Sequence, residues 1–226
     1  MSKLHAVLLD LDGTLIDSRP GIAGSARAAL RSLGHAPDDT LDVTVFIGPP
    51  LQDMLRALLQ AHGDDPVGDD QVDAAVLAYR QHYGDIGLFD CALYPGIRES
   101  LQEMHGAGLQ LYLATSKREV FARRILEHLG LASLFAAIHG SVPSGALDHK
   151  PELLAHILSM RNISARDGVM IGDRRHDIAG AHAVGLRSLG VLWGYGSRDE
   201  LEAAGADRLV ESPLDLARMI ASMVTR

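Results

Sequence analysis

The chain has 226 residues, 47% of them hydrophobic and 22% charged, a balance that excludes a disordered protein and allows a sizeable core. Its 29 acidic and 21 basic residues give a net charge of −8, which disfavours nucleic acid as a partner because an acidic surface repels phosphodiester backbones. The single cysteine excludes an intramolecular disulfide, and no apolar run is long enough to predict a membrane span. We therefore expect a cytoplasmic protein, either a monomer or a homodimer, without membrane partners.

Short apolar runs alternate with helical periods along most of the chain. Buried strands are predicted at 6–9, 109–114, 135–139, 169–171 and 188–193. Between them, apolar residues recur at helical spacing, as around Leu101 and Leu154. Strands that alternate with helices indicate an α/β fold with a doubly wound parallel sheet that is covered on both faces.

The alternation is interrupted after the first strand. Residues 18–88 contain Ala-rich and Leu-rich helical periods that are separated by a Gly-Pro-Pro turn and an acidic turn. The predicted helical stretches are 20–33, 51–61 and 71–83. We expect an all-helical inserted domain at 18–88 and an α/β core domain at 1–17 and 89–226.

The strongest motif follows the first strand and reads Asp-Leu-Asp-Gly-Thr-Leu-Ile-Asp-Ser from Asp10 to Ser18. Ligands of open α/β sheets bind beyond the carboxyl ends of the strands, which is where Asp10 and Asp12 are expected. Two neighbouring carboxylates repel each other and need a cation or a shared proton. The motif therefore predicts a ligand or metal site at this edge of the sheet.

This motif resembles the signature of the haloacid dehalogenase superfamily of phosphohydrolases, and further motifs follow in the order typical of that family. They are Thr115-Ser116-Lys117 after a strand, Lys150-Pro151-Glu152 at a helix start, and Gly172-Asp173 followed by Asp177. The helical insert directly after the first motif is similar to the subgroup that has a small helical cap. Phosphoglycolate phosphatase-like and 5′-nucleotidase-like members are the relatives that the whole pattern resembles most.

The chemistry of phosphate transfer suits the acidic residues of these motifs. An aspartate can be a covalent nucleophile, and Asp10 at the strand end suits that role. Asp12 is close enough to act as the general acid and base. A metal must separate the anionic nucleophile from the anionic substrate, and Asp10 and Asp173 offer the carboxylates that Mg²⁺ prefers. The resemblance adds the backbone carbonyl of Asp12 as a ligand, and Asp177 is expected to support the metal site or to orient Lys150.

Four residues are predicted to bind the substrate. Thr115 and Lys150 are expected to hold the transferring phosphoryl group, and Ser116, where many relatives have Asn, retains a hydrogen-bonding side chain. Gly48, in the Gly-Pro-Pro turn of the insert, is expected to place backbone N–H groups toward the leaving group.

Other residues near the motifs have weaker functional interpretations. Lys117 and Arg174 can each be interpreted equally well as a substrate contact or as a solvated charge. The Trp-Gly-Tyr-Gly segment at 193–196 could line the rim of the active site, but packing residues followed by a flexible turn are the favoured interpretation.

These features predict a magnesium-dependent phosphatase that hydrolyses a small phosphorylated metabolite through an aspartyl-phosphate intermediate. The expected substrate is a phosphoglycolate-like compound or a nucleoside 5′-monophosphate. One alternative is a sugar phosphomutase on the same core, although the insert lacks a lysine. Another is a phosphoaspartate signalling module without turnover, against which Asp12, the insert and the later acid pair argue.

Overall fold

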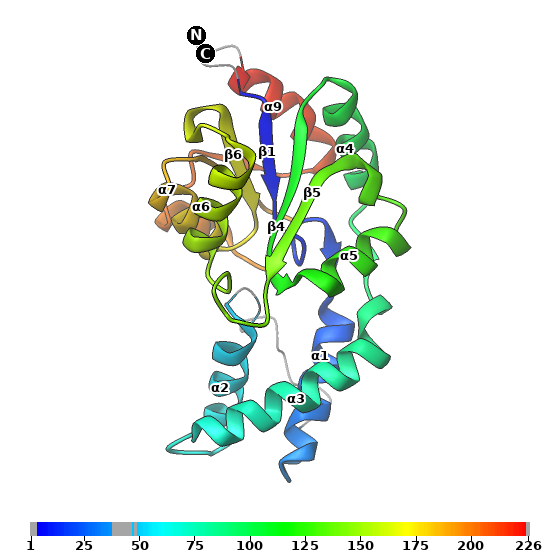
Figure 1. Ribbon diagram of the computed structural model, residues 1–226, viewed down its shortest axis with the longest axis vertical. Coiled ribbons are helices and arrows are strands. Elements are labelled where there is room, and N and C mark those ends of the chain that lie inside the picture. The colour runs from blue at the N-terminus through cyan, green and yellow to red at the C-terminus, as the bar shows by residue number, and fades with distance from the viewer. Residues whose placement is uncertain (1–3, 38–46, 48, 225–226) are drawn as a thin grey trace. The chain divides into compact units, whose positions relative to one another are not determined.

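The computed structural model describes residues 4–37, 47 and 49–224 (Figure 1). Two compact units divide the chain: unit 1 comprises Met1–Asp17 and Leu93–Arg226, and unit 2 comprises Ser18–Ala92. The second boundary lies four residues beyond the position expected from the sequence. Residues up to Ala92 belong with the helices because the Asp90 carbonyl accepts a hydrogen bond, 3.1 Å long, from the N–H of Gly21 in the first helix.

The sheet of unit 1 has six strands in the order β5-β4-β1-β6-β7-β8, and all of its neighbouring strands are parallel. The strands are β1 (Ala6–Leu9), β4 (Gln110–Arg118), β5 (Phe135–Ser141), β6 (Gly168–Gly172), β7 (Arg187–Val191) and β8 (Arg208–Val210). This sheet confirms the predicted doubly wound α/β fold class.

Helices cover both faces of this sheet, with α4 and α5 on one side and α6 and α7 on the other (Figure 1). The helices of unit 1 are α4 (Ile97–Gly106), α5 (Glu119–His128), α6 (Lys150–Arg161), α7 (Arg175–Ala183), α8 (Arg198–Ala203) and α9 (Leu216–Val224), with short 3₁₀ turns at η3 (Ala132–Leu134), η4 (Ala165–Asp167) and η5 (Pro213–Asp215). Buried residues of β1, β4 and β6, such as Leu8, Tyr112 and Met170, pack against Leu154 and Ile157 of α6. None of the helices in the described ranges is both long and apolar enough to cross a membrane.

The strand register brings the motifs to one edge of the sheet. Leu9, the last residue of β1, pairs with Leu113 of β4 on one side and with Ile171 of β6 on the other. The N–H of Asp10 then donates to the carbonyl of Ile171 over 3.0 Å. Residues that follow these strands therefore share the carboxyl edge, as the parallel arrangement requires.

Strand β4 is longer than the sequence predicted, because it continues through the hydroxyl motif to Arg118. Gly140 of β5 allows this, since a Cβ there would lie 2.4 Å from the carbonyl oxygen of Lys117. Strand β8 was not predicted at all: it has three residues, and only Val210 is fully buried.

Unit 2 consists mainly of α1 (Arg19–Ser32), α2 (Leu51–Ala61), α3 (Asp69–Asp85) and the 3₁₀ turn η2 (Gly87–Phe89). Gly21 lets α1 approach η2 closely, because a Cβ there would lie 2.1 Å from the Gly87 carbonyl oxygen. The buried Ser25 hydroxyl donates to the Gly21 carbonyl over 2.7 Å and lies 3.0 Å from Nδ1 of His82 on α3.

Two short strands mark the places where the chain passes between the units. Strand β2 (Ile16–Asp17) ends where the chain leaves unit 1, and β3 (Ala92–Leu93) begins where it leaves unit 2. They pair with each other in a separate two-stranded sheet.

Candidate active site at the carboxyl ends of the strands

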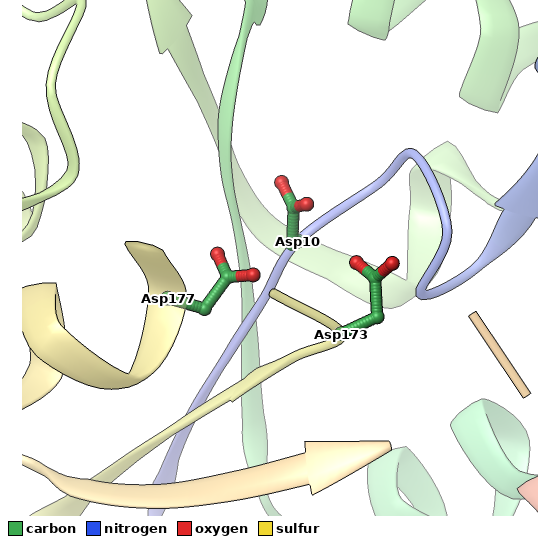
Figure 2. Close-up of side chains that lie close together, drawn as sticks. All are labelled: Asp10, Asp173 and Asp177. Atoms are coloured by element: carbon green, nitrogen blue, oxygen red, sulfur yellow. The ribbon is translucent and has the colours of Figure 1, made fainter. Parts of the chain in front are cut away.

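Three carboxylates meet at the carboxyl edge of the main sheet. Asp10 follows β1, Asp173 follows β6, and Asp177 lies in the first turn of α7. One oxygen from each lies within 4.8 Å of the other two, and Figure 2 shows the three side chains around a shared space. All three are buried, and Asp173 has no exposed surface. The sequence predicted this convergence for Asp10, Asp173 and the supporting Asp177.

Lys150, the first residue of α6, is the cation among these acids. Its Nζ lies 2.8 Å from Oδ1 of Asp10 and 2.7 Å from Oδ1 of Asp177. Besides the hydrogen bond to Asp10, Lys150 donates a second one, 2.7 Å long, to the carbonyl of Ala114 at the end of the apolar part of β4. An ammonium group has three N–H donors, and these two hydrogen bonds and the ion pair with Asp177 surround Lys150 Nζ with three oxygens.

Burial and charge shift the pKa values of this cluster strongly. Burial raises the pKa of Asp10 from 3.8 to about 6, and the Asp177 and Asp12 carboxylates add to the rise that Lys150 opposes. Burial, with the nearby charges of Asp177 and Asp10, raises the pKa of Asp173 well above its ordinary value. Burial alone would lower the pKa of Lys150, but the Asp10 and Asp177 carboxylates raise it above its ordinary value. Lys150 is therefore charged at neutral pH.

The charge balance of the cluster suits a divalent cation. Among the described residues, three buried carboxylates face the Lys150 ammonium, and the nearby Arg174 is paired with Glu200, which leaves an excess of negative charge away from water. Uncompensated buried charges are costly, and a cation relieves that cost. The available donors are oxygens, which hard cations such as Mg²⁺ prefer.

Asp12 points its carboxylate to a different partner. Its Oδ1 forms an ion pair with Nζ of Lys117 over 2.9 Å, and the two side chains are only 14% and 8% exposed. Lys117 is thus neither a simple solvated charge nor distant from the site. Lys117 lies near the end of β4, and the strand fixes the direction of its side chain. The predicted strand ended at residue 114, so the sequence did not determine that direction.

The predicted phosphate-binding residues lie on or beside β4 and α6. Thr115 is buried, and its hydroxyl accepts a hydrogen bond, 3.2 Å long, from the backbone N–H of Lys117. Ser116 lies in the same strand and is partly exposed. Gly48 lies outside the described residues.

Arg174 is not the solvated charge that one interpretation of its sequence position gave. It is buried, and its Nε donates to Oε1 of Glu200 on α8 over 2.8 Å. The same oxygen accepts the backbone N–H of Arg175 over 2.9 Å. Arg174 therefore joins α7 to α8 instead of projecting as a solvated charge.

Residues 193–196 contact Asp173, whereas the sequence favoured packing and a flexible turn over a place at the rim of the site. The N–H of Tyr195 donates to Oδ2 of Asp173 over 2.7 Å, while the Thr14 hydroxyl donates to Oδ1 over 3.3 Å. The available signal was the glycine pair directly after β7, a strand of the same parallel sheet. Glycines are equally common in ordinary turns, so the sequence favoured a turn for this segment.

Comparisons with known proteins identify the family of the chain. The family model described as haloacid dehalogenase-like hydrolase matches residues 7–191. A Pseudomonas aeruginosa protein named 5'-nucleotidase is 42% identical over 87% of this chain and 86% of its own length. A Neisseria meningitidis phosphoglycolate phosphatase is 32% identical over 92% of this chain and 88% of its own. The Mycobacterium tuberculosis tyrosine-protein kinase PtkA is 38% identical over 87% of this chain, but the match spans only 65% of PtkA.

Solved structures share the architecture of the whole chain. A predicted phosphatase from Clostridium acetobutylicum superposes with a TM-score of 0.91 at 36% identity, covering 98% of this chain and 100% of that one. The family model covers most of the chain, including the strands that carry the buried acids. The protein is a hydrolase that belongs to the haloacid dehalogenase-like family.

Proposed function

We propose that the protein is a magnesium-dependent phosphatase that hydrolyses a small phosphomonoester through an aspartyl-phosphate on Asp10. The observation that carries this proposal is the buried acidic cluster, in which Lys150 holds Asp10 beside Asp173 and Asp177. The names of the relatives support phosphoric monoester hydrolysis as the reaction class.

Asp10 is the nucleophile in this proposal. One carboxylate oxygen attacks phosphorus, which forms the new phosphorus–oxygen bond as the bond to the leaving oxygen breaks. With a pKa of about 6, most Asp10 is ionised at pH 7, as the attack requires. Lys150 fixes the carboxylate in position through its hydrogen bond to Oδ1.

Asp12 is the proposed general acid and base. In its protonated form it gives the proton to the leaving oxygen, and the alcohol departs. It then takes a proton from the water that attacks the phosphorus of the aspartyl-phosphate. That step releases inorganic phosphate and restores both carboxyl groups. Lys117 holds Asp12 in position through their ion pair.

Asp10, Asp173 and the backbone carbonyl of Asp12 are the proposed magnesium ligands, and Asp177 supports them by binding Lys150. A bound Mg²⁺ would neutralise charge between the carboxylates and the phosphoryl group. Thr115, Ser116 and Lys150 are proposed to hold the phosphoryl oxygens. For Lys150 this requires that one of its present acceptors gives way to the substrate.

The helical unit 2 is proposed to act as a cap that selects the leaving group, with Gly48 as one of its substrate-binding residues. The relatives named 5'-nucleotidase and phosphoglycolate phosphatase support a nucleoside 5′-monophosphate or a phosphoglycolate-like acid as substrate. We further propose that the protein acts on free metabolites in the cytoplasm.

The decisive experiment is phosphate release from a panel of small phosphomonoesters, with Mg²⁺ and with excess EDTA. We expect Mg²⁺-dependent release from at least one nucleoside monophosphate or short phosphorylated acid, and none with EDTA. Undiminished release after exhaustive chelation would remove the metal from the proposal.

Three further measurements separate the competing functions. A requirement for a sugar bisphosphate would indicate a phosphomutase. A lasting aspartyl-phosphate without phosphate release would indicate a signalling module. Transfer of the γ-phosphate of ATP to tyrosine would indicate a kinase, the activity in the name of PtkA.

A further inference from the structure

The segment Trp193–Gly196, which we call the glycine loop, lies directly against Asp173. A Cβ at Gly194 would lie 2.3 Å from the Asp173 Cβ and 2.4 Å from the Gly13 carbonyl oxygen. A Cβ at Gly196 would lie 2.0 Å from the Asp173 carbonyl oxygen. Real Cβ contacts are never this short, so the backbone reaches Asp173 only because both residues are glycine.

The glycine loop makes a directed contact with the carboxylate of Asp173. The Tyr195 N–H donates to Oδ2 over 2.7 Å, and Thr14 donates to Oδ1 over 3.3 Å. The shorter bond occupies Oδ2 from the side of the loop. It fixes the rotation of the carboxylate and leaves Oδ1 as the oxygen with the weaker protein hydrogen bond.

Two side chains of the glycine loop tie it to the segment that follows β1. The indole N–H of Trp193 donates to the Thr14 carbonyl over 3.0 Å. The Tyr195 hydroxyl donates to Oδ1 of Asp17 over 3.4 Å. The loop therefore connects Asp173 to the same segment that carries Asp12.

We propose that the glycine loop is a positioning element that aims Asp173 so that it binds Mg²⁺ through one oxygen. This inference rests on the proposed function, because it presumes the magnesium site. Mg²⁺ demands near-octahedral coordination, whereas Ca²⁺ accepts more ligands and two oxygens from one carboxylate. A carboxylate with one oxygen held by Tyr195 suits the smaller ion. The loop therefore contributes to the preference for Mg²⁺ over Ca²⁺.

The test measures metal affinity directly, by calorimetric titration of the full, metal-free chain with MgCl₂ and with CaCl₂. Gly194→Ala is the principal variant, because its methyl group must displace Asp173 or the loop. We expect Mg²⁺ affinity to fall about tenfold or more, in the range seen when groups behind a metal ligand are lost. We also expect the ratio of Mg²⁺ to Ca²⁺ affinity to fall, a change that general loss of stability does not produce.

The matched control is Gly106→Ala, at the end of α4, where a Cβ meets no atom within 4 Å. Its affinity for both ions should equal that of the wild type. Trp193→Phe is the milder second variant: it retains both glycines and an aromatic ring, and it removes the hydrogen bond to Thr14 together with part of the packing of the indole. If Gly194→Ala does not fold, Trp193→Phe tests the role of the loop in its place. We expect it to lower Mg²⁺ affinity and the ratio of Mg²⁺ to Ca²⁺ affinity by less than Gly194→Ala does.

The outcomes distinguish this inference from the proposed function. If the wild type binds Mg²⁺ and the folded loop variants bind both ions as the wild type does, the role of the loop is overturned and the proposed function stands. If the wild type binds no Mg²⁺, the proposed magnesium site fails and the inference fails with it. A loss of the Mg²⁺ preference confined to the loop variants supports the inference.

Discussion

Units 1 and 2 differ most in the polar groups that they bury. Among the described residues, the fully buried polar side chains of unit 2 are the hydroxyls of Ser18 and Ser25. Unit 1 buries carboxylates and cations as well, namely Asp10, Lys150, Asp173, Arg174 and Asp177. Buried charges are costly and add little to stability even when paired. We interpret the buried acids and Lys150 of unit 1 as retained for the proposed chemistry, whereas Arg174 joins α7 to α8 and the buried Ser25 hydroxyl contributes to packing in unit 2.

The strongest test of this contrast is Asp10→Asn. The amide cannot attack phosphorus, so turnover should fall by about 10³-fold or more, as when other covalent nucleophiles are removed. Steady-state assays on the best substrate of the panel would measure the loss. Mass spectrometry should exclude deamidation back to Asp, and activity above a few per cent in an intact Asn protein would refute the nucleophile assignment.

Asp12→Ala should have the next largest effect, and that effect should depend on the leaving group. Removing a general acid costs ~10²–10⁴-fold when the leaving oxygen needs a proton. The loss of kcat should therefore be large for alkyl phosphates and smaller for para-nitrophenyl phosphate, whose leaving group is already stable. Equal losses for both substrates would assign Asp12 to water activation or to structure.

The pH dependence of stability should reveal the cost of charging Asp10. Its pKa of about 6 in the folded protein exceeds 3.8, so the protonated form favours folding below about pH 4. That contribution is lost as the pH rises through 6. Above that pH, the charge on Asp10 lowers the free energy of unfolding by on the order of 3 kcal/mol. Asp10→Asn should therefore raise the melting temperature of the metal-free protein at pH 7.5 and change it little at pH 4.

The control for this melting experiment is Asp73→Asn at an exposed position of α3, which should show no such pH-dependent difference. Mg²⁺ should stabilise the wild type at pH 7.5 more than it stabilises Asp10→Asn. Identical melting shifts with pH in the wild type and Asp10→Asn would contradict the assigned pKa.

The smallest expected effect lies in unit 2. Ser25→Ala removes a buried hydroxyl that binds Gly21 and His82, which should cost about 1–2 kcal/mol of folding stability. The kcat for para-nitrophenyl phosphate should not change, because Ser25 packs α1 and takes no part in the proposed chemistry. Ser32→Ala, in the same helix but exposed, is the matched control and should cost less. A lower kcat for folded Ser25→Ala would contradict the claim that the buried Ser25 hydroxyl of unit 2 contributes only to packing.

The acidic cluster was predictable from the sequence because each residue follows a strand or begins a helix of one parallel sheet. Asp10 and Asp173 come directly after apolar runs, and parallel strands place such residues at a common edge. Lys150 was expected with them through its motif at a helix start.

Other features depended on contacts that no local pattern encodes. The Lys117–Asp12 ion pair depends on how far β4 continues, and that length depends on Gly140 of the neighbouring strand. The glycine loop has the composition of a turn, and its contact with Asp173 becomes visible only in the folded structure. Strand β8 was too short for its alternation to be detected.

The pairing of β2 with β3 has a consequence for how this architecture can change over generations. The pair brings together the two points at which the helical unit is inserted, so the insert begins and ends at neighbouring positions. The entropy of closing a segment between fixed ends grows slowly, by about 0.6 kcal/mol per doubling of its length. Segments of very different length and sequence can therefore be exchanged at this junction at little cost to the sheet. If unit 2 selects the leaving group as proposed, its replacement would change selectivity, while the residues that follow β1, β4 and β6 remain in place.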